Sequence, residues 1–208
     1  MFSMTRKTRL LAVPVLFVAA VAMPAMGEGL PKAGDALPDA MVRDEQGREV
    51  SLHDLVDGKP TVLVFYRGGW CPFCTKHLKE LAGIVKPLDA AGVQLLAISM
   101  DRPEKIAATP GRDALPYRLL SDSDAAAAKA FGIAFTVDDA TVKKYKGFGI
   151  DLDDASGRDH HMLPHPAVFV CDAAGTLRLV EANPDYKVRV PADTILKAAL
   201  DAAGRSSD

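Results

Sequence analysis

Cysteine and tryptophan are scarce in this sequence. Its 208 residues include three cysteines and one tryptophan. Two of the cysteines, Cys71 and Cys74, form a single C-x-x-C pair. Apart from Cys74–His77, which shares a cysteine with this pair, no second C-x-x-C or C-x-x-H follows to complete four ligands, which disfavours a structural zinc site. The sequence also lacks internal repeats and low-complexity tracts, so a repeat architecture is not indicated.

An excess of basic charge is missing as well. The formal net charge is −2, and residues 1–27 hold three basic and no acidic side chains, so residues 28–208 carry a formal charge of −5. A mildly acidic surface disfavours nucleic acid and anionic membranes as partners. About 180 residues suit one domain with a single core. We therefore expect residues 28–208 to form one domain that binds no nucleic acid.

Long hydrophobic runs are absent except near the N-terminus. Three basic residues precede the apolar stretch Leu10–Val21, and the small residues Ala25 and Gly27 follow it. This pattern predicts a signal peptide over residues 1–27, cleaved before Glu28, and export to a bacterial periplasm. The alternative is an uncleaved anchor, although the run is short for a membrane span. In an oxidising compartment a C-x-x-C pair rests as a disulfide, so a reducing partner is expected.

The C-x-x-C pair stands closely behind the apolar run Thr61–Tyr66, which is typical of a central strand covered on both faces. A helix that begins at Pro72 offers unpaired N–H groups and a positive dipole end, which stabilise a thiolate on Cys71. Pro72 fits the first turn because its missing N–H is not needed there. The arrangement predicts a dithiol that closes reversibly to a disulfide. The alternative is two inert core cysteines.

The order of apolar runs predicts an α/β fold. The helix from Pro72 shows a helical apolar period, with Pro87 bending or ending it, and a buried strand follows at Val93–Ser99. Strand, helix and strand at this spacing imply a parallel pair joined by a right-handed crossover. The other expected elements are a hairpin over Met41–Val50, a helical turn over Ser51–Leu55, a helix over Pro103–Ala108, a strand over Tyr117–Leu120, a helix over Asp122–Phe131, a hairpin over Ala167–Cys171 and Leu177–Glu181, and a helix over Pro191–Ala203.

A long insertion lies between Gly132 and Pro166. Asp138–Tyr145 is predicted to form a short helix, packed down by Val142, Tyr145 and Phe148. The acidic stretch from 151 to 159 is predicted to be a mobile loop. Connections of this length within one domain are usually functional or disordered.

Several blocks of the sequence carry a resemblance to a known family. They are Gly34–Asp39, Ser51–Leu55, Val62–Cys74, Leu163–Asp172 and Pro184–Tyr186. Together they resemble the thioredoxin fold in its peroxiredoxin-like form, the alkyl hydroperoxide reductase and thiol-specific antioxidant (AhpC/TSA) superfamily. The resemblance implies a central mixed β-sheet flanked by helices, with an N-terminal hairpin extension and an insertion before a cis-proline.

The same resemblance implies roles around the pair. Cys71 is the expected nucleophile and Cys74 the expected resolving thiol, shielded by Trp70. Pro166 matches the cis-proline that packs against the disulfide, and His165 before it is expected to tune Cys71 or touch substrate. The implied activity is thiol–disulfide exchange or thioredoxin-dependent peroxide reduction, with no cofactor. The implied partners are a thioredoxin-like or other dithiol reductant and, in some relatives, a second copy of the chain.

One departure from the family pattern leaves the substrate open. Typical peroxiredoxins place a threonine three residues before the nucleophile, where its hydroxyl orients the peroxide, and a distant arginine stabilises the thiolate. Gly68 stands at that position here. Arg67 is the arginine nearest in sequence, and no spacing selects among Arg118, Arg178 and Arg189. A peroxide and a protein disulfide both stay candidate substrates.

A copper-handling protein is the alternative of a different class. Cys71, Cys74 and His165 together offer two thiolates and an imidazole, a donor set that suits Cu(I). His160 and His161 are expected in a solvated loop. Structural roles are expected for the remaining candidates, which are an exposed helix residue at His77, a core residue at Cys171, and a solvated acidic turn, in preference to a calcium site, at Asp151, Asp153 and Asp154.

Overall fold

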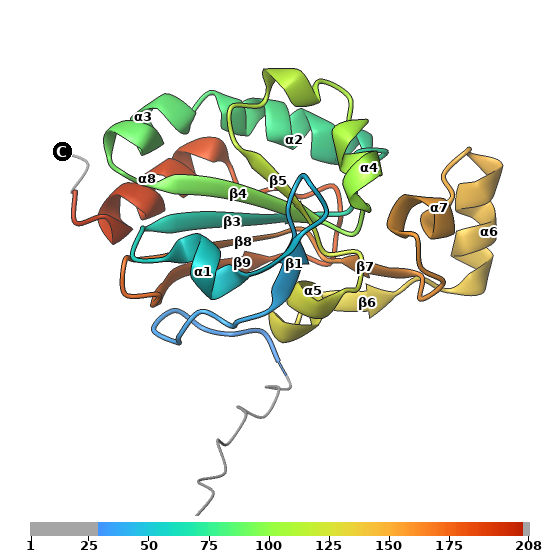
Figure 1. Ribbon diagram of the computed structural model, residues 1–208, viewed down its shortest axis with the longest axis horizontal. Coiled ribbons are helices and arrows are strands. Elements are labelled where there is room, and N and C mark those ends of the chain that lie inside the picture. Colours follow the sequence, from blue (N-terminus) through green and yellow to red (C-terminus); the bar gives the residue numbers. More distant parts are fainter. Residues whose placement is uncertain (1–28, 206–208) are drawn as a thin grey trace, which may run out of the picture.

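The computed structural model describes residues 29–205, and in this range one sheet of seven strands lies between layers of helices (Figure 1). The predicted signal peptide, residues 1–27, lies outside the described residues. The strands of the sheet are β1 (Met41–Arg43), β2 (Glu49–Ser51), β3 (Thr61–Tyr66), β4 (Gln94–Ser99), β5 (Arg118–Ser121), β8 (Ala167–Cys171) and β9 (Leu177–Ala182). Their order is β2-β1-β5-β4-β3-β8-β9. β3, β4 and β5 are parallel and the outer pairings are antiparallel, which confirms the predicted mixed sheet.

Helices cover both faces of this sheet. They are α1 (Leu52–Val56), α2 (Pro72–Ala82), α3 (Val85–Ala90), α4 (Pro103–Ala107), α5 (Ala126–Ala130), α6 (Asp139–Gly147), α7 (Leu152–Ser156) and α8 (Ala192–Ala202), with a short 3-10 turn η1 (Arg112–Ala114). Every residue of β3 is buried, and alternate side chains enter different cores. Phe65 packs with Phe131 and Phe169 on one face, whereas Tyr66 shares the opposite core with Leu78 of α2. The β3–α2 connection therefore leaves the sheet between two packed layers.

The helix predicted from Pro72 ends earlier than expected. It breaks between α2 and α3 at Gly83 and Ile84, and Pro87 lies inside the first turn of α3. Proline is tolerated in a first turn because the N–H groups there have no partner within the helix. The break falls one turn before Pro87, whose missing N–H cannot bond to the Gly83 carbonyl, and this confirms the prediction that Pro87 bends or ends the helix.

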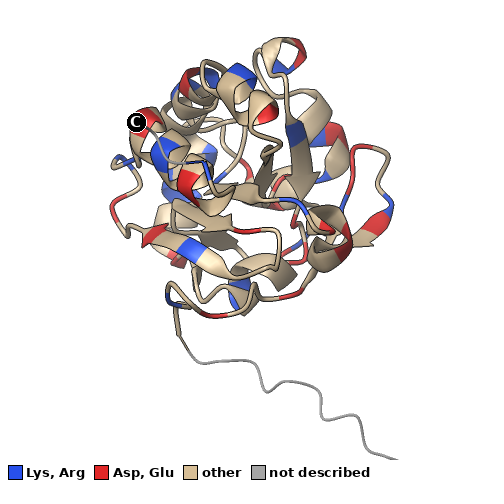
Figure 2. Ribbon diagram, turned by 90° about the vertical axis from the view of Figure 1, so that its left-hand side faces the viewer, with Lys and Arg blue, Asp and Glu red and all other residues tan. Residues whose placement is uncertain are grey.

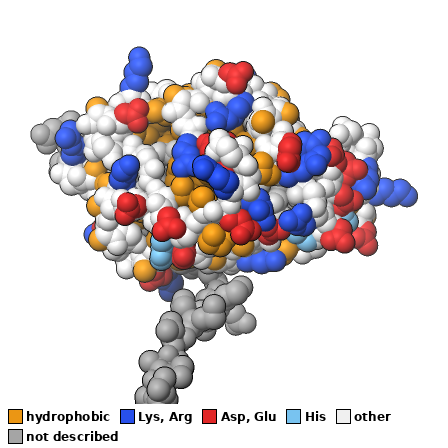
Figure 3. All heavy atoms as spheres, viewed as in Figure 1, with side chains coloured by type: hydrophobic (Ala, Val, Ile, Leu, Met, Phe, Trp, Pro, Cys, Tyr) orange, Lys and Arg blue, Asp and Glu red, His pale blue; other side chains and the backbone are white. Residues whose placement is uncertain are grey.

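The insertion is more ordered than predicted. Strands β6 (Ala134–Thr136) and β7 (Met162–Pro164) pair antiparallel and close its ends, and α6 confirms the predicted helix. The stretch predicted as a mobile loop contains α7, because the Asp151 carboxylate accepts hydrogen bonds from the N–H groups of Asp153 and Asp154. Acidic side chains gather at the end of the molecule formed by α6 and α7 (Figure 3).

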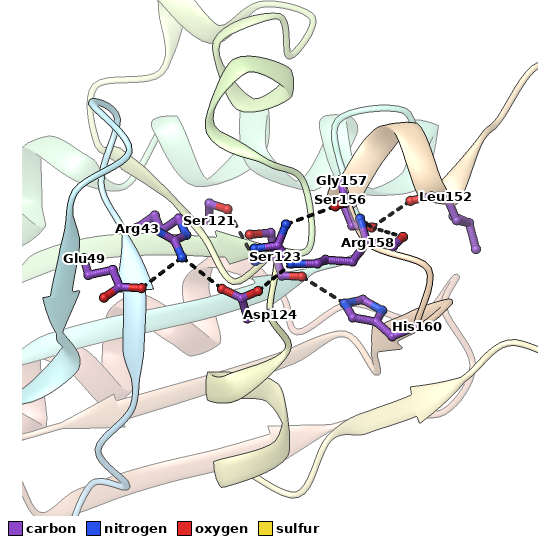
Figure 4. A network of polar contacts seen from close by, with 10 residues as sticks. All are labelled: Arg43, Glu49, Ser121, Ser123, Asp124, Leu152, Ser156, Gly157, Arg158 and His160. Carbon is purple, nitrogen blue, oxygen red and sulfur yellow. Dashed lines mark hydrogen bonds and ion pairs between the residues drawn. The ribbon is translucent and has the colours of Figure 1, made fainter.

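A polar network joins the C-terminal part of the insertion to β1 and to the segment after β5 (Figure 4). Asp124 pairs with Arg43 of β1 at 3.2 Å and with Arg158 after α7 at 2.7 Å, and His160 Nε2 lies 2.9 Å from the Ser123 carbonyl. His160 and His161 are partly buried by such contacts, so the solvated loop predicted for them was wrong. Elsewhere basic and acidic residues are interspersed along the fold (Figure 2). Within residues 29–205 no helix has the length and apolar character that a membrane span requires.

Candidate active site

The C-x-x-C pair lies at the N-terminus of α2, where β3 ends. Cys71 is the N-cap residue, Pro72 occupies the first turn, and the Cys71 carbonyl accepts hydrogen bonds from the N–H groups of Cys74 and Thr75, both at 3.0 Å. This is the predicted strand-to-helix placement of the dithiol. Both cysteines are free thiols, and their exposed fractions are 2% for Cys71 and 0% for Cys74. The dithiol is therefore formed but covered.

The two thiols have opposite acidities. A hydrogen bond from the Cys74 thiol, aided by the Cys74 N–H and by the charges of Arg67 and Arg189, lowers the pKa of Cys71 to about 6. The same hydrogen bond and burial raise the pKa of Cys74 far above its ordinary value. Cys71 is therefore a thiolate at neutral pH while Cys74 keeps its proton. This asymmetry fits a nucleophile and a resolving thiol.

Arg67 is buried beside the dithiol, as its proximity in sequence predicted. Only 4% of it is exposed, and its guanidinium lies 5.1 Å from the Trp70 ring, 5.4 Å from the Tyr145 ring and 4.5 Å from the Tyr186 ring. One guanidinium N–H donates to the Tyr145 hydroxyl. Among residues 29–205 no carboxylate pairs with this guanidinium. The Cys71 thiolate is thus the anion that acts on it.

Arg189 supplies a second cation from a distant part of the chain. It follows β9, and its guanidinium donates to Cys74 Sγ at 3.3 Å. The segment that carries it, residues 183–190, also places Tyr186 against Phe73 with ring centroids 5.7 Å apart. Sequence spacing did not select Arg189 from the other arginines, whereas the structure does. Arg118 pairs with Glu45 and Arg178 pairs with Asp172, both away from the dithiol.

Gly68 and Trp70 account for the missing threonine. A Cβ at position 68 would lie 2.3 Å from Trp70 Nε1 and 2.7 Å from Asp101 Oδ1, so no side chain fits there without displacing them. Asp101 is 2% exposed, and its Oδ2 accepts a hydrogen bond from the Gly69 N–H at 2.6 Å. Burial raises the pKa of Asp101 to about 7. The partly buried Trp70 indole and the Asp101 carboxyl group therefore fill the space that a threonine side chain would need, and Asp101 holds the loop through the Gly69 N–H.

Pro166 does not have the predicted conformation. The His165–Pro166 peptide bond is trans. Extended backbone lies on both sides of it, and the N–H groups of His165 and Asn183 bond to the carbonyls of Ile133 and Pro166 at 2.8 and 3.0 Å. These bonds hold the extended path through position 166 that a trans bond gives, so the cis prediction was wrong.

His165 stacks on Phe135 with centroids 4.5 Å apart, and burial lowers its pKa. No hydrogen bond joins His165 to either cysteine among the described residues, and a role at the dithiol stays a prediction. Within that same range no group of three His, Cys, Asp or Glu side chains forms a metal-binding set. The copper alternative therefore has no third ligand to rest on.

Two further histidine and cysteine predictions have clear outcomes. His77 was predicted to be exposed, but it is 4% exposed, because the segment before α8 covers α2 and His77 Nε2 lies 3.1 Å from the Val190 carbonyl. That prediction was wrong. Cys171 is fully buried opposite Thr61, which confirms its predicted place in the core.

The predicted solvated acidic turn is also different in the structure. Asp151 and Asp153 pair with Lys146, and Asp154 pairs with Arg102 and Lys105. These side chains are partly exposed and join α6, α7 and α4. The acidic run is therefore a set of ion pairs that fixes the insertion, and the simple turn prediction was wrong.

Known proteins with similar sequences are peroxiredoxins. Peroxiredoxin Bcp of Escherichia coli (strain K12) is 35% identical over 102 residues, which are 49% of this chain and 65% of that protein. The chloroplastic peroxiredoxin Q of Gentiana triflora is 28% identical over 150 residues, 72% of this chain and 58% of that protein. The matches thus span less than two thirds of either relative.

Solved structures show the same fold. Peroxidoxin BcpB from Mycobacterium tuberculosis superposes with a TM-score of 0.62 at 22% identity and covers 83% of this chain and 96% of its own. Reduced Prx3 from Vibrio vulnificus, in complex with H₂O₂, gives a TM-score of 0.65 at 22% identity and covers 82% and 99%. These likenesses confirm the predicted thioredoxin-like, peroxiredoxin-type architecture. Because residues 33–180 match the family model, the chain belongs to the AhpC/TSA family.

Proposed function

We propose that the chain is a thiol-dependent peroxide reductase in which Cys71 is the nucleophile, Cys74 is the resolving thiol and a thioredoxin-like dithiol is the reductant. Family membership and the peroxiredoxin relatives support the reaction class. The observation that carries the choice of peroxide is the burial of Cys71. The Cys71 thiolate has a pKa of about 6, two arginines nearby and only 2% exposure, so a small oxidant needs a much smaller opening to reach it than a protein disulfide, which would have to displace the covering segments.

The chemistry follows from the two acidities. The Cys71 thiolate attacks one peroxide oxygen, the O–O bond breaks, and the leaving oxygen takes a proton to depart as water or an alcohol. Cys71 is then a sulfenic acid. The Cys74 sulfur attacks the Cys71 sulfur, the S–O bond breaks, and the thiol proton leaves with the hydroxyl as water. An external dithiol reduces the Cys71–Cys74 disulfide and is itself oxidised to a disulfide.

The arginines have separate tasks in this scheme. Arg67 and Arg189 stabilise the Cys71 thiolate before attack. Arg189 also donates to Cys74 Sγ, so it lies beside the sulfur that must lose its proton in the second step. Trp70 packs against the core that contains both cysteines. Pro72 fixes the first turn of α2, which carries Cys74.

The experiment uses Trp70, the chain's only tryptophan. The reduced protein is mixed with hydrogen peroxide in a stopped-flow instrument while Trp70 fluorescence is followed. A rapid change that is proportional to peroxide concentration and is lost in Cys71→Ser supports the proposal. Cys74→Ser is the matched control, because it should keep the first step and lose the second. A rate no faster than that of an ordinary free thiol would exclude peroxide as the substrate.

We also propose that residues 1–27 are removed on export and that the remaining domain works in the periplasm. The basic, apolar and small-residue order of this segment supports the proposal. Intact-mass analysis of the protein recovered from a periplasmic fraction tests it, because cleavage predicts a chain that begins at Glu28. We further propose that the domain forms a homodimer, which light scattering of the same material tests.

A further inference from the structure

Arg67 presents a problem of charge. Burying an isolated cation is unfavourable unless it is paired or well hydrogen-bonded. Among residues 29–205 this guanidinium has no carboxylate partner, and its Nε has no hydrogen-bond partner. The aromatic faces of Trp70, Tyr145 and Tyr186 surround it instead. Aromatic faces attract a cation, but this attraction does not fix the direction in which the guanidinium N–H groups point.

Tyr145 differs from the other two aromatic residues because it also makes a directional contact. Its hydroxyl accepts the hydrogen bond from the Arg67 guanidinium, and its ring lies 6.0 Å from the Trp70 ring. Tyr186 contacts the guanidinium through its ring and stands on a more exposed segment. Tyr145 therefore sets where the Arg67 charge lies.

The helix that carries Tyr145 is itself fastened. α6 begins at the N-cap Asp138, which accepts from the Thr141 N–H at 2.9 Å, and Val142 is buried. Lys146 pairs with Asp151 and Asp153 at the start of α7. Asp154 of α7 then pairs with Arg102 and Lys105 of the sheet domain. These ion pairs thus link the insertion to α4.

We propose that Tyr145 is a positioning residue for the redox reaction: its hydroxyl and ring hold the Arg67 guanidinium beside the dithiol. This rests on the proposed function only in naming the reaction. The insertion, which sequence analysis left without a role, thereby completes the site. Arg67 acts on the reacting thiolate through its charge, and Tyr145 acts through Arg67.

Several groups near the two sulfurs influence the Cys71 pKa, and a test must separate the effect of Tyr145 from theirs. They are the partner thiol from α2, Arg67 from the loop after β3, and Arg189 from the segment after β9. Asp101, after β4, acts on Cys74 through its charge. Of these groups only Arg67 contacts Tyr145, and loss of the hydroxyl alone keeps the ring contact with Trp70, so the change should reach Cys71 through Arg67.

The test measures the rate at which Cys71 is alkylated by iodoacetamide as a function of pH, read by mass spectrometry of the Cys71 peptide. Tyr145→Phe keeps the ring and removes the hydroxyl. We expect the midpoint of the profile to rise by about half a pH unit, which lowers the alkylation rate below the midpoint about threefold. Tyr117→Phe is the control, because it also removes a buried hydroxyl, one that donates to the Leu78 carbonyl, yet it should leave the midpoint unchanged.

A double-mutant cycle decides the route. In the Arg67→Gln background, Tyr145→Phe should shift the midpoint no further. An equal shift with and without Arg67, or no shift in Tyr145→Phe alone, would overturn the proposal, and the second outcome needs no Arg67 variant to fold. Alkylation requires no peroxide. A protein that fails to reduce peroxide but shows the midpoint shift would therefore refute the proposed function and keep the role of Tyr145.

Discussion

The β3–α2 unit, residues 61–82, and the two segments that cover it, residues 133–164 and 183–190, contribute to the same site in different ways. The β3–α2 unit supplies the sulfurs, which lie at the start of α2. Its strand is fully buried, and the apolar face of its helix is packed against the core. The covering segments supply Tyr145, Tyr186 and Arg189 from partly exposed backbone. The unit therefore fixes which atoms react, and the covering segments fix the charge around them and the access to them.

The largest effect is expected where the unit has no spare room. Gly68→Thr restores the residue type usual in the family, but its Cβ would lie within 2.7 Å of both Trp70 Nε1 and Asp101 Oδ1. Overpacking a buried position costs about 3 kcal/mol, so we expect a loss of that order in the free energy of unfolding and a slower, not faster, reaction with peroxide. Urea unfolding and stopped-flow fluorescence measure the two effects.

Gly147→Ala in the insertion is the matched control for Gly68→Thr. A Cβ at Gly147 meets no atom within 4 Å, and the residue ends α6, where alanine is favoured over glycine. We expect stability to change by less than about 1 kcal/mol. Equal losses at both positions would show that the unit is no more tightly packed than its cover.

The next effect concerns a buried carboxylate that holds the unit in place. Burial raises the pKa of Asp101 to about 7, so between about pH 4 and pH 7 the folded protein binds one proton more than the unfolded chain. The stability that this proton contributes is complete below about pH 4 and falls by about 1.4 kcal/mol per pH unit as the pH rises to 7. Asp101→Asn does not titrate and keeps an oxygen for the Gly69 N–H. Its unfolding free energy relative to wild type should therefore increase over that range.

Urea unfolding of wild type and Asp101→Asn in a series of buffers tests this slope. Subtracting the unfolding free energy of the wild type from that of Asp101→Asn at each pH removes the contribution of every other titrating group, including Cys71. A stability difference that stays constant from acid to neutral pH would mean that Asp101 is ionised throughout. The loop at Gly69 would then be held by a charged acceptor.

These contrasts also separate what the sequence could predict from what it could not. The unit was predictable because its signals are local: an apolar run, a proline in a first turn and two cysteines at fixed spacing. Arg67 followed from adjacency alone. Tyr145 and Arg189 lie 78 and 115 residues from the groups they bond, and no periodicity links positions so far apart. Their roles depend on how two loops fold back, which a single sequence does not encode in any short pattern.

The wrong predictions have the same origin. The helical spacing of α2 predicts an exposed His77, whereas the distant Val190 covers it. The acidic composition of the Asp151 stretch predicts a loop, whereas its basic partners stand on other elements. The family resemblance predicts a cis bond before Pro166, whereas the neighbouring strands hold a trans bond. Local chemistry was predicted correctly, and the contacts between segments were not.

The effect of the covering segments on the Cys71 pKa can be tested at Arg189. Arg189→Gln removes the charge that helps to lower the pKa of Cys71 and the donor to Cys74 Sγ. Because an opposite charge nearby favours the thiolate, we expect the Cys71 pKa to rise by about one unit from its value near 6. Reaction with peroxide should then increase with pH through about 7 instead of about 6, with a loss of up to about tenfold below the midpoint.

Arg178→Gln provides the control, because Arg178 pairs with Asp172 on an exposed strand and should leave the pH profile unchanged. Stopped-flow rates at a series of pH values measure both variants. If Arg189→Gln also leaves the midpoint in place, the unit alone sets the thiolate and the cover only limits access.

The smallest effect is expected at the outer edge of the cover. Asp154→Asn removes the carboxylate that pairs with Arg102 at 2.7 Å and with Lys105, but about half of this side chain is exposed to solvent. An exposed ion pair contributes little and is weakened by salt, so the unfolding free energy should fall only slightly, and less at high ionic strength. Because the pair joins α7 to α4, the Cys71 midpoint is the more informative measurement. A shift in that midpoint without a comparable loss of stability would mean that surface ion pairs hold the insertion against the dithiol. The Cys71 pKa would then depend on an exposed residue of the cover as well as on the buried unit.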